Sequence, residues 1–362
     1  MPQYAATLKN AIFNEVNQQN NKDVKNESPL KGLKIVLNSG NGSGGFFNEV
    51  LESLGADVSA SAHVEPNPDF PFGVPNPEKN EMISETIRLC EASGADLGIL
   101  LDTDADRSGF VVPSDGSGTA FEPLNRNRLI ALLSVIFSRA SPGCTIVTDS
   151  VTSEGLASFI KEDLNLQHVR YLKGYANVIG KAEELNEMAG VNAEMAIETS
   201  GHCAMKENGF LDDGTYTAVK VIGLLARERL ADSNRVPNLL GLISSMKEMD
   251  EVAELRMDAI DGSLETTESI FEMGARIIED SCAERSLSWN LDGENLEGVR
   301  VRTGSGGFFM LRKSLHDPLI SLQIESTSKE DAMKTVVVPL LEKFQSVEAI
   351  SGSLDLNALR NY

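Results

Sequence analysis

Three aspartates in a short loop between two apolar segments place the strongest constraint on how this 362-residue chain folds. Asp102, Asp104 and Asp106 directly follow the apolar run 95–101, and apolar character resumes over 108–112. Both runs have the length and composition of buried strands. The aspartates are therefore expected in a tight loop at the end of a strand, where alternate carboxylates can converge on one point.

The spacing of these aspartates predicts a Mg²⁺ site. Proteins usually hold this ion with a few oxygen ligands and leave room for water or a phosphate oxygen. Arg107 closes the loop and offers a bidentate fork for a phosphate that shares the site. An EF-hand is excluded, because its sixth and twelfth positions need Gly and Glu, and this chain has Arg107 and Pro113 there. A solvated acidic turn is the other interpretation, and the flanking apolar strands argue against it.

The composition is that of an ordinary globular protein with room for two or three domains. A formal net charge of −22 argues against nucleic acid or an anionic membrane as a partner, because both require basic surface. The chain has no run of about 18 apolar residues, so no membrane span is expected. Its four cysteines are far apart, which predicts free thiols in a reducing compartment.

The order of expected elements repeats along the chain, which predicts two similar α/β domains. A strand at 34–37 leads into a glycine-rich turn and a helix over 46–54, and the pattern of 144–150 resembles that first strand. Later, a strand at 193–197 ends in the polar loop 198–202. Both domains thus place acidic residues at the carboxyl end of a strand, which is the edge where open α/β sheets bind ligands.

After about residue 250 the pattern changes to that of an antiparallel sheet with helices. The expected elements are strands at 298–302, 307–312 and 318–325 and helices over 265–280 and 329–346. We therefore predict two similar mixed α/β/α sandwich domains, over 1–118 and 119–249. A small α+β C-terminal domain with an antiparallel sheet is expected to follow over 250–362.

The segment Gly40–Gly45 matches G-x-G-x-x-G between a strand and a helix, which also suits a dinucleotide-binding turn. The long proline-rich loop that follows, over 66–77, fits a compact βαβ unit poorly. Glycines that permit close packing of strand and helix are the preferred interpretation. An NAD-dependent dehydrogenase is therefore a distant alternative.

The loop 198–202 combines a carboxylate, a hydroxyl and an imidazole on one turn. Glu198 and Ser200 have the acceptors and donors needed to read vicinal sugar hydroxyls. His202 titrates near neutral pH and can move a proton. The alternative is a helix cap or a turn with a solvent-facing histidine, and the segment alone does not decide between them.

Two further segments carry groups that suit a phosphorylated ligand. Arg312, Ser314 and His316 offer the charge and donors that a phosphate needs, although a basic hairpin that blunts a sheet edge fits the same residues. Lys173 and Gly174 form another candidate, which equally fits an ordinary turn.

Taken together and in this order, these loops resemble the α-D-phosphohexomutase superfamily, the phosphoglucomutases and phosphomannomutases. The resemblance runs from about Tyr4 to the carboxyl end. Within it, the segments 123–130 and 314–318 are similar to the phosphoglucomutase-like branch of plants and algae. That branch implies a soluble protein of the cytoplasm or plastid.

The resemblance implies a four-domain enzyme in which a phosphoserine donates its phosphoryl group to a hexose monophosphate, glucose 1-phosphate or glucose 6-phosphate above all. Mg²⁺ is the implied cofactor and glucose 1,6-bisphosphate the implied activator. The metal ligands would be Asp102, Asp104 and Asp106, and the catalytic residues His202, as general acid or base, and Arg107. The substrate-binding residues would be Glu198, Ser200, Lys173, Gly174, Arg312, Ser314 and His316.

The chain departs from the family pattern at three places. Thr103 and Ala105 replace the usual glycines of the metal loop, which implies some strain or an altered backbone there, while every ligand is kept. Leu315, His316 and Asp317 replace the usual end of the phosphate loop, which leaves the preferred hexose open. The nucleophile loop, Thr-Ala-Ser-His-Asn-Pro, appears nowhere in the chain.

We therefore expect the chain to correspond to the second to fourth domains, without the phosphoserine domain. It is then either a fragment of a mutase or a short relative that binds sugar phosphates without turnover, as a regulator or subunit. Loss of the first domain would expose an apolar interface, so we also expect self-association.

Overall fold

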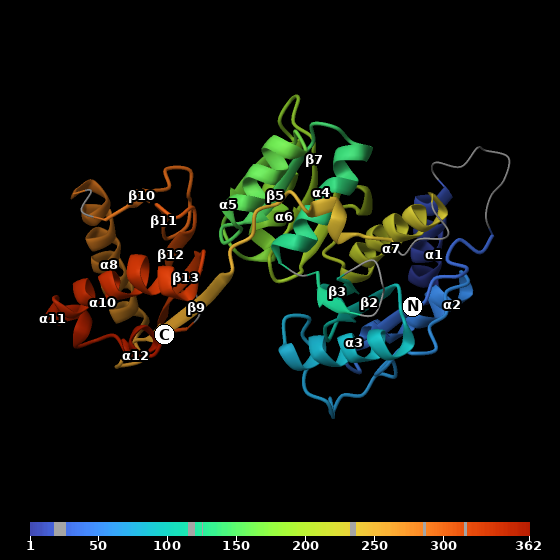
Figure 1. Cartoon of the computed structure of the whole chain (residues 1–362), viewed down its shortest axis with the longest axis horizontal. Helices are drawn as coiled ribbons and strands as arrows, with labels where there is room; N and C mark the ends of the chain where they lie inside the picture. The colour runs from blue at the N-terminus through green and yellow to red at the C-terminus, as the bar shows by residue number, and fades with distance from the viewer. Residues whose placement is uncertain (18–26, 115–119, 125, 232–236, 285–286, 315–316) are drawn as a thin grey trace. The chain divides into compact units, whose positions relative to one another are not determined.

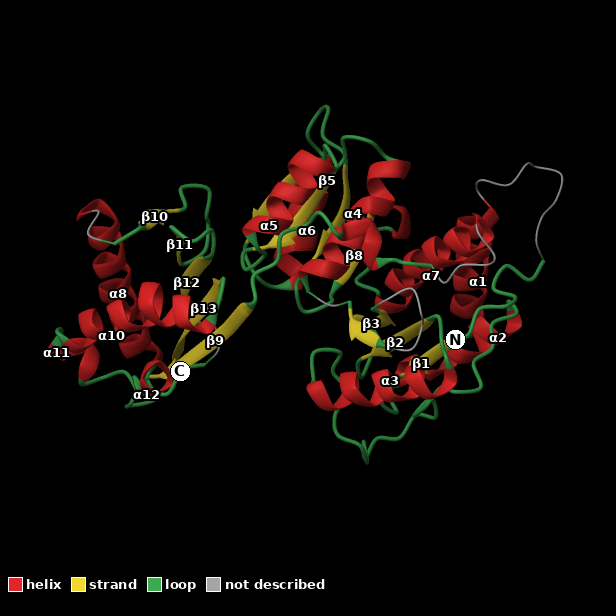
Figure 2. Cartoon of the chain, in the orientation of Figure 1, coloured by secondary structure: helices red, strands yellow, loops and turns green. Residues whose placement is uncertain are grey.

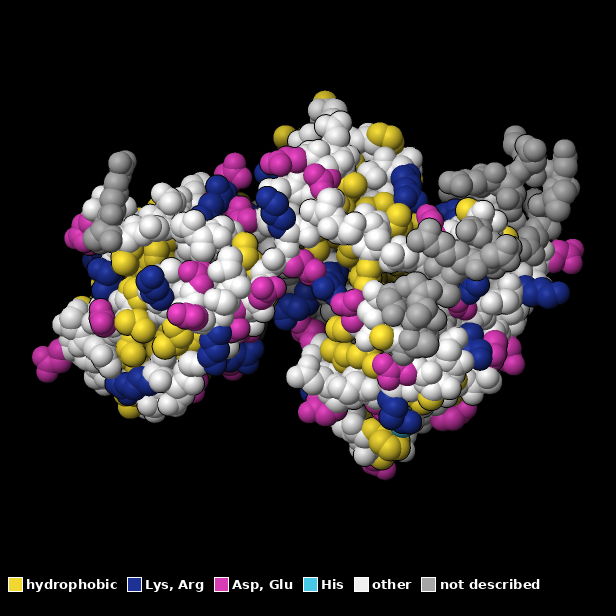
Figure 3. Space-filling view, viewed as in Figure 1, with side chains coloured by type: hydrophobic (Ala, Val, Ile, Leu, Met, Phe, Trp, Pro, Cys, Tyr) yellow, Lys and Arg dark blue, Asp and Glu magenta, His cyan; other side chains and the backbone are white. Residues whose placement is uncertain are grey.

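The computed structural model of the chain describes residues 1–17, 27–114, 120–124, 126–231, 237–284, 287–314 and 317–362 (Figure 1). It forms two compact units. The first unit comprises Met1–Asp149, Phe159–Val169 and Gly174–Met246, and the second comprises Ser150–Ser158, Arg170–Lys173 and Lys247–Tyr362. Over the face shown in Figure 3, acidic and basic side chains are interspersed in each unit.

The first sheet has the strand order β1-β2-β3-β4 (Figure 2). β1 (Ile35–Asn38) and β2 (Leu97–Leu101) are parallel, whereas β3 (Ser108–Pro113) and β4 (Phe121–Pro123) continue the sheet antiparallel. Every residue of β1, β2 and β3 is buried, which explains their unbroken apolar runs. Its helices are α1 (Pro2–Asn17), α2 (Phe47–Ser53) and α3 (Asn80–Ser93).

The helix α3 packs on this sheet through one apolar face. Met82 and Cys90 of α3 join Val36, Leu100 and Val111 of the strands in one buried cluster. The strands predicted on either side of the aspartates are confirmed, as is the irregular proline-rich loop at 66–77.

The second sheet has the strand order β6-β5-β7-β8. β5 (Thr145–Asp149) and β7 (Ala193–Ile197) are parallel, β8 (Cys203–Met205) returns antiparallel, and β6 (Gln167–Tyr171) lies at the edge. Its helices are α4 (Asn127–Ala140), α6 (Tyr175–Asn186) and α7 (Gly214–Ala231). The short helix α5 (Glu154–Ser158), which follows β5 in the sequence, belongs to the second unit. The loop β7–β8 occupies the place that the aspartate loop β2–β3 has in the first sheet, so the predicted similarity of the two domains is confirmed.

The third sheet is antiparallel throughout, with the strand order β10-β11-β12-β13-β9. Its strands are β9 (Glu251–Asp258), β10 (Trp289–Leu291), β11 (Val299–Thr303), β12 (Phe308–Lys313) and β13 (Leu319–Ser326). Its helices are α8 (Leu264–Glu284), α9 (Lys329–Ala332), α10 (Val338–Gln345), α11 (Glu348–Ser351) and α12 (Asn357–Arg360). A π turn, Met333–Val337, joins α9 to α10, so the helix predicted over 329–346 is one run with a local bulge. The core gathers around Trp289, Phe309 and Phe344.

This architecture confirms the predicted fold class. The domain boundaries at 118 and 249 stay predictions, and β4 extends the first sheet beyond residue 118. The loop expected between Asn17 and Ser28 falls largely outside the described residues. All four cysteines are free thiols. Among the described residues, no helix is long and apolar enough to cross a membrane.

Candidate active site

The three aspartates converge at the end of β2, as their spacing predicts. One carboxylate oxygen from each of Asp102, Asp104 and Asp106 lies within 4.8 Å of the others. Asp102 is buried, Asp106 is half-buried and Asp104 is exposed. The backbone makes this convergence possible at Ala105, whose φ of 67° lies in the left-handed region. A residue with a Cβ is strained in that conformation, which agrees with the strain implied by the loss of glycine there.

Arg107 fixes the geometry of Asp102 from the far end of the same loop. Its Nε donates to Asp102 Oδ2 at 2.7 Å, and its backbone N–H donates to Asp102 Oδ1 at 3.1 Å. Both oxygens of the buried carboxylate are therefore oriented before any ligand binds.

The aspartate cluster fits a hard divalent cation. Asp106 Oδ1 is buried and has no hydrogen-bond partner among the described residues. Burial, followed by the negative charge of Asp102, raises the pKa of Asp106 to about 6. A buried oxygen without a donor, beside two further carboxylates, forms the all-oxygen donor set that Mg²⁺ prefers.

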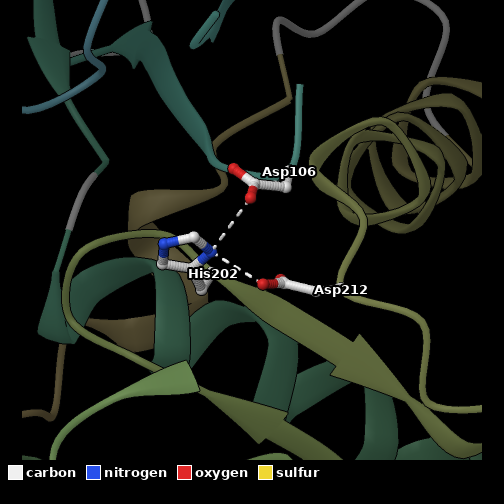
Figure 4. Close-up of side chains that lie close together, drawn as sticks. All are labelled: Asp106, His202 and Asp212. Carbon is white, nitrogen blue, oxygen red and sulfur yellow. Dashed lines mark hydrogen bonds and ion pairs between the residues drawn. The ribbon is translucent and has the colours of Figure 1, made fainter. Parts of the chain in front are cut away.

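His202 lies beside this cluster and is held by a second carboxylate (Figure 4). Its Nδ1 donates to Asp212 Oδ2 at 2.7 Å and lies 3.7 Å from Asp106 Oδ2. Burial alone would lower the pKa of His202, but the hydrogen bond and charge of Asp212 outweigh burial and raise it. The ring of Tyr175 stacks on the imidazole with centroids 5.0 Å apart. Because Asp212 takes Nδ1–H, the other ring nitrogen, Nε2, is directed away from both carboxylates.

The loops β2–β3 and β7–β8 lie side by side in the first unit. Arg107 and His202 form an isolated antiparallel bridge, and the Ser108 amide faces the Gly201 carbonyl oxygen at 3.4 Å. A Cβ at Gly201 would lie 2.7 Å from the Ser108 carbonyl oxygen, and its φ is 100°. Only glycine permits this approach, so Gly201 brings the two candidate loops together.

Glu198 is oriented toward the Gly174 turn. Its Oε1 accepts the Gly174 amide at 2.6 Å, and Ser200 Oγ lies 3.5 Å from its Oε2. The backbone of the loop is fixed by Thr199, whose amide and hydroxyl both donate to Asp149 Oδ2. The structure therefore brings Glu198, Ser200 and Gly174 together in the first unit.

The segment after β12 belongs to the second unit. The side chain of Arg312 is 19% exposed and lies 3.6 Å from Glu297 and 4.0 Å from Glu254. The Ser314 hydroxyl accepts the Asp317 amide at 3.1 Å. β12 is a central strand, so a basic hairpin that blunts a sheet edge is the wrong interpretation of this loop. His316 lies outside the described residues.

Comparison with known proteins identifies the family. Family models of phosphoglucomutase/phosphomannomutase match residues 5–116, as α/β/α domain II, and residues 125–239, as α/β/α domain III. Together they match well over half of the chain. This chain belongs to the phosphoglucomutase/phosphomannomutase family.

Curated relatives carry the same family name but are longer. A phosphomannomutase/phosphoglucomutase of Pseudomonas aeruginosa is 29% identical over 312 residues, which cover 84% of this chain and 60% of that protein. One from Pseudomonas syringae pv. tomato is 31% identical over 210 residues, 57% of this chain and 42% of that protein. The chain thus spans at most about three fifths of these two relatives.

Solved structures of the superfamily share the fold. A phosphoglucomutase/phosphomannomutase family protein from Burkholderia thailandensis superposes with a TM-score of 0.70 at 21% identity, covering 96% of this chain and 64% of that chain. N-acetylphosphoglucosamine mutase from Aspergillus fumigatus, in complex with GlcNAc-6P and magnesium, gives a TM-score of 0.59 at 13% identity, covering 96% and 65%.

Within this family fold, the candidate residues separate between the two units. The first unit holds Asp102, Asp104, Asp106, Arg107, Gly174, Glu198, Ser200 and His202, and the second holds Lys173, Arg312 and Ser314. Sequence reasoning missed Asp212, although the acidic pair 212–213 just before the apolar helix α7 was a usable signal. It also missed Glu297, which has no motif of its own.

Proposed function

We propose that this chain provides the metal-binding, sugar-binding and phosphate-binding parts of a phosphohexomutase. The reaction would move a phosphoryl group between two positions of a hexose phosphate, with glucose 1-phosphate and glucose 6-phosphate as the preferred pair. The observation that supports this most is the meeting of the three aspartates with the pair His202–Asp212 in one unit. The likeness of segments 123–130 and 314–318 to the plant and algal branch favours glucose over mannose.

Asp102, Asp104 and Asp106 would hold Mg²⁺, and Arg107 keeps Asp102 oriented for it. When bound, the cation neutralises negative charge that develops on the transferred phosphoryl group. Asp102 uses the Nε and backbone N–H of Arg107, which leaves the terminal amines of this guanidinium to bind a phosphate oxygen. Structures of Aspergillus fumigatus N-acetylphosphoglucosamine mutase contain magnesium in one case and glucose 1,6-bisphosphate in another, which supports the same cofactor and activator here.

His202 would exchange a proton with the sugar hydroxyl that gains or loses the phosphoryl group. Asp212 holds its Nδ1–H and stabilises the imidazolium, so proton transfer occurs at Nε2. Glu198 and Ser200 would accept hydrogen bonds from sugar hydroxyls and donate hydrogen bonds to them, and Gly174 and Lys173 are further substrate-binding candidates. Arg312, Ser314 and His316 would bind the phosphate that is not transferred.

The serine that carries the phosphoryl group would lie outside these residues, because the chain has no nucleophile loop of the family type. That absence favours a second candidate function, a sugar-phosphate-binding relative or regulator without turnover. Self-association through an exposed domain interface remains part of this hypothesis.

The glycine-rich turn does not support a dehydrogenase. Its amides at Gly40, Asn41, Gly42 and Ser43 donate to Asn38, His63, Ser39 and Thr103, in that order. A dinucleotide-binding turn needs free amides to cradle a pyrophosphate. The glycines serve packing instead, since a Cβ at Gly45 would lie 1.6 Å from the Val64 carbonyl oxygen.

The deciding experiment measures two properties of the purified chain with Mg²⁺ and a trace of glucose 1,6-bisphosphate. These are conversion of glucose 1-phosphate to glucose 6-phosphate, and binding of glucose 6-phosphate by calorimetry. Turnover that Asp104→Asn abolishes would support the mutase site and contradict the expectation that the chain lacks its phosphoryl-donating serine. Binding without turnover would support a chain without that serine, either a part of a mutase or the second candidate function. Asp69→Asn, the same charge change at an exposed site, is the matched control. Absence of both binding and turnover would contradict the proposal.

A further inference from the structure

Glu297 holds groups from three separate segments of the second unit. Its Oε2 accepts the backbone amide of Lys173 at 2.9 Å and the hydroxyl of Ser150. Its Oε1 lies 3.6 Å from Nη1 of Arg312. The side chain is 18% exposed, so these interactions are only partly screened by water.

The backbone around Glu297 is itself fixed against the strand that carries Arg312. Asn295 Nδ2 donates to the carbonyl oxygens of Glu297 and Gly298, at 2.6 and 3.2 Å. Gly298 has a φ of 59°, and a Cβ there would lie 2.2 Å from the Leu311 carbonyl oxygen. The backbone next to Glu297 therefore lies close against Leu311, the residue before Arg312 in β12, which limits movement of the carboxylate relative to Arg312.

The two carboxylate oxygens of Glu297 contact different groups. The charge-assisted hydrogen bond to the Lys173 amide fixes the turn that leads into Gly174. The contact with Arg312 is an ion pair without hydrogen-bond geometry, so it restrains the guanidinium while its N–H groups stay available for an anion. Restraining a long side chain before binding reduces the entropy lost on binding.

We propose that Glu297 is a positioning residue that holds Lys173 and Arg312 ready for one hexose phosphate. This inference rests on the proposed function, because it assigns Lys173 to the sugar and Arg312 to the phosphate. Charge alone predicts the opposite effect, because a carboxylate beside a phosphate site repels the phosphate. A residue present only for charge balance would give tighter phosphate binding when removed, whereas a positioning residue gives weaker binding.

The test measures binding of glucose 6-phosphate and of inorganic phosphate to the full chain by calorimetry. Glu297→Ala should weaken glucose 6-phosphate binding about tenfold, because a hydrogen bond to a charged group and a restrained arginine are both lost. Inorganic phosphate has no sugar to contact Lys173 and can bind at Arg312 alone, so its affinity should fall about threefold or less. Glu254→Gln is the matched control, since Glu254 is 4.0 Å from Arg312 and is more exposed. It should change either affinity less than about twofold.

Amide hydrogen exchange of the peptide containing Lys173 gives a readout that needs no ligand. Exchange should accelerate in Glu297→Ala and stay slow in Glu297→Gln, because a glutamine oxygen still accepts the Lys173 amide. Glu297→Gln should weaken glucose 6-phosphate binding about threefold through loss of the ion pair with Arg312. This variant keeps the shape of the side chain and carries the test if Glu297→Ala does not fold.

Unchanged or tighter glucose 6-phosphate binding in Glu297→Gln would overturn the inference, as would unchanged exchange at Lys173 in a folded Glu297→Ala. A different result would show that the proposed function itself is wrong. In that case Arg312→Ala would leave glucose 6-phosphate binding unchanged, while exchange at Lys173 would still report whether Glu297 holds that turn.

Discussion

Two clusters of charged residues in this protein differ in the sign of the charges that they bring together. In the first unit, Asp102, Asp104 and Asp106 place three like charges together. In the second unit, Arg300 is fully buried but surrounded by opposite charge. It is 2.9 Å from Glu154 and 3.3 Å from Asp292.

The surroundings of Arg300 show what a structural charge cluster requires. Its guanidinium donates to the carbonyl oxygens of Ser150 and Thr152 at 2.8 and 2.9 Å and lies 3.5 Å from the centre of the Phe308 ring. Arg170 and Arg302 pair with the same two carboxylates, Glu154 and Asp292. Paired charge thus fastens the segment 150–158 within its unit, whereas three carboxylates share a single arginine, Arg107, in the aspartate loop. In this chain, the candidate metal site has an excess of like charge, whereas the structural cluster around Arg300 pairs opposite charges.

Breaking the paired cluster should have the largest effect on stability. Arg300→Met leaves Glu154 and Asp292 less compensated in a buried setting, and we expect a loss of about 3–5 kcal/mol in the free energy of unfolding. Urea unfolding followed by the fluorescence of Trp289, the single tryptophan, reports on this unit.

Arg302→Met is the matched control, because the Arg302 side chain is 46% exposed. It should cost less than about 1 kcal/mol. Equal losses in the two variants would mean that burial of the pair does not decide its contribution.

Removing one charge from the aspartate loop should have the opposite sign. Without Mg²⁺, Asp106→Asn should stabilise the chain by about 1 kcal/mol at pH 7, after allowance for its partial exposure. The folded-state pKa of Asp106, about 6, is above its ordinary value of 3.8, so its favourable contribution exists below pH 3.8 and is lost as pH rises through 6. The advantage of Asn should therefore grow between pH 4 and pH 7. Added Mg²⁺ should raise the melting temperature of the parent chain only.

Glu154→Gln tests the same linkage in the paired cluster. Burial opposes ionisation of Glu154, but the charges of Arg170 and Arg300 outweigh burial and lower its pKa. Its stabilising contribution is therefore present above the ordinary value of 4.5 and is lost as pH falls through the lowered pKa. Relative to the parent chain, the free energy of unfolding of Glu154→Gln should therefore rise as the pH falls. That of Asp106→Asn should fall toward the parent value over the same range. If the differences in unfolding free energy between variant and parent changed with pH in the same direction for both variants, the contrast between the two charge clusters would be contradicted.

The sequence predicted the parts of this protein that depend on local pattern. The aspartate loop and its flanking strands, the alternation in 298–302, 307–312 and 318–325, and the helix over 265–280 all follow from spacing within a few residues. β9 was missed although partly buried and exposed residues alternate along most of it, because several of its positions are charged and its partner β13 lies some sixty residues further on.

The site residues that the sequence did not reveal depend on long-range contacts. Asp212 reaches His202 only because the chain turns back after β8, and nothing in the nine intervening residues predicts that direction. Glu297 meets Lys173 across 124 positions, and Arg300 meets Ser150 across 150. Spacing cannot encode such contacts, because they are set by how the sheets and loops pack.

The smallest expected effect comes from the backbone of the aspartate loop. Ala105 has a φ of 67°, and it stands where the family pattern has glycine. Ala105→Gly should stabilise the chain by about 0.5 kcal/mol, since relief of the left-handed strain exceeds the cost of a more flexible unfolded chain. Ala95→Gly is the matched control, because Ala95 is buried with an ordinary φ, and it should destabilise by about the same amount. Urea unfolding of both variants measures the difference. If Ala105→Gly also destabilises, the loop is not strained, and charge repulsion alone distinguishes it from the paired cluster around Arg300.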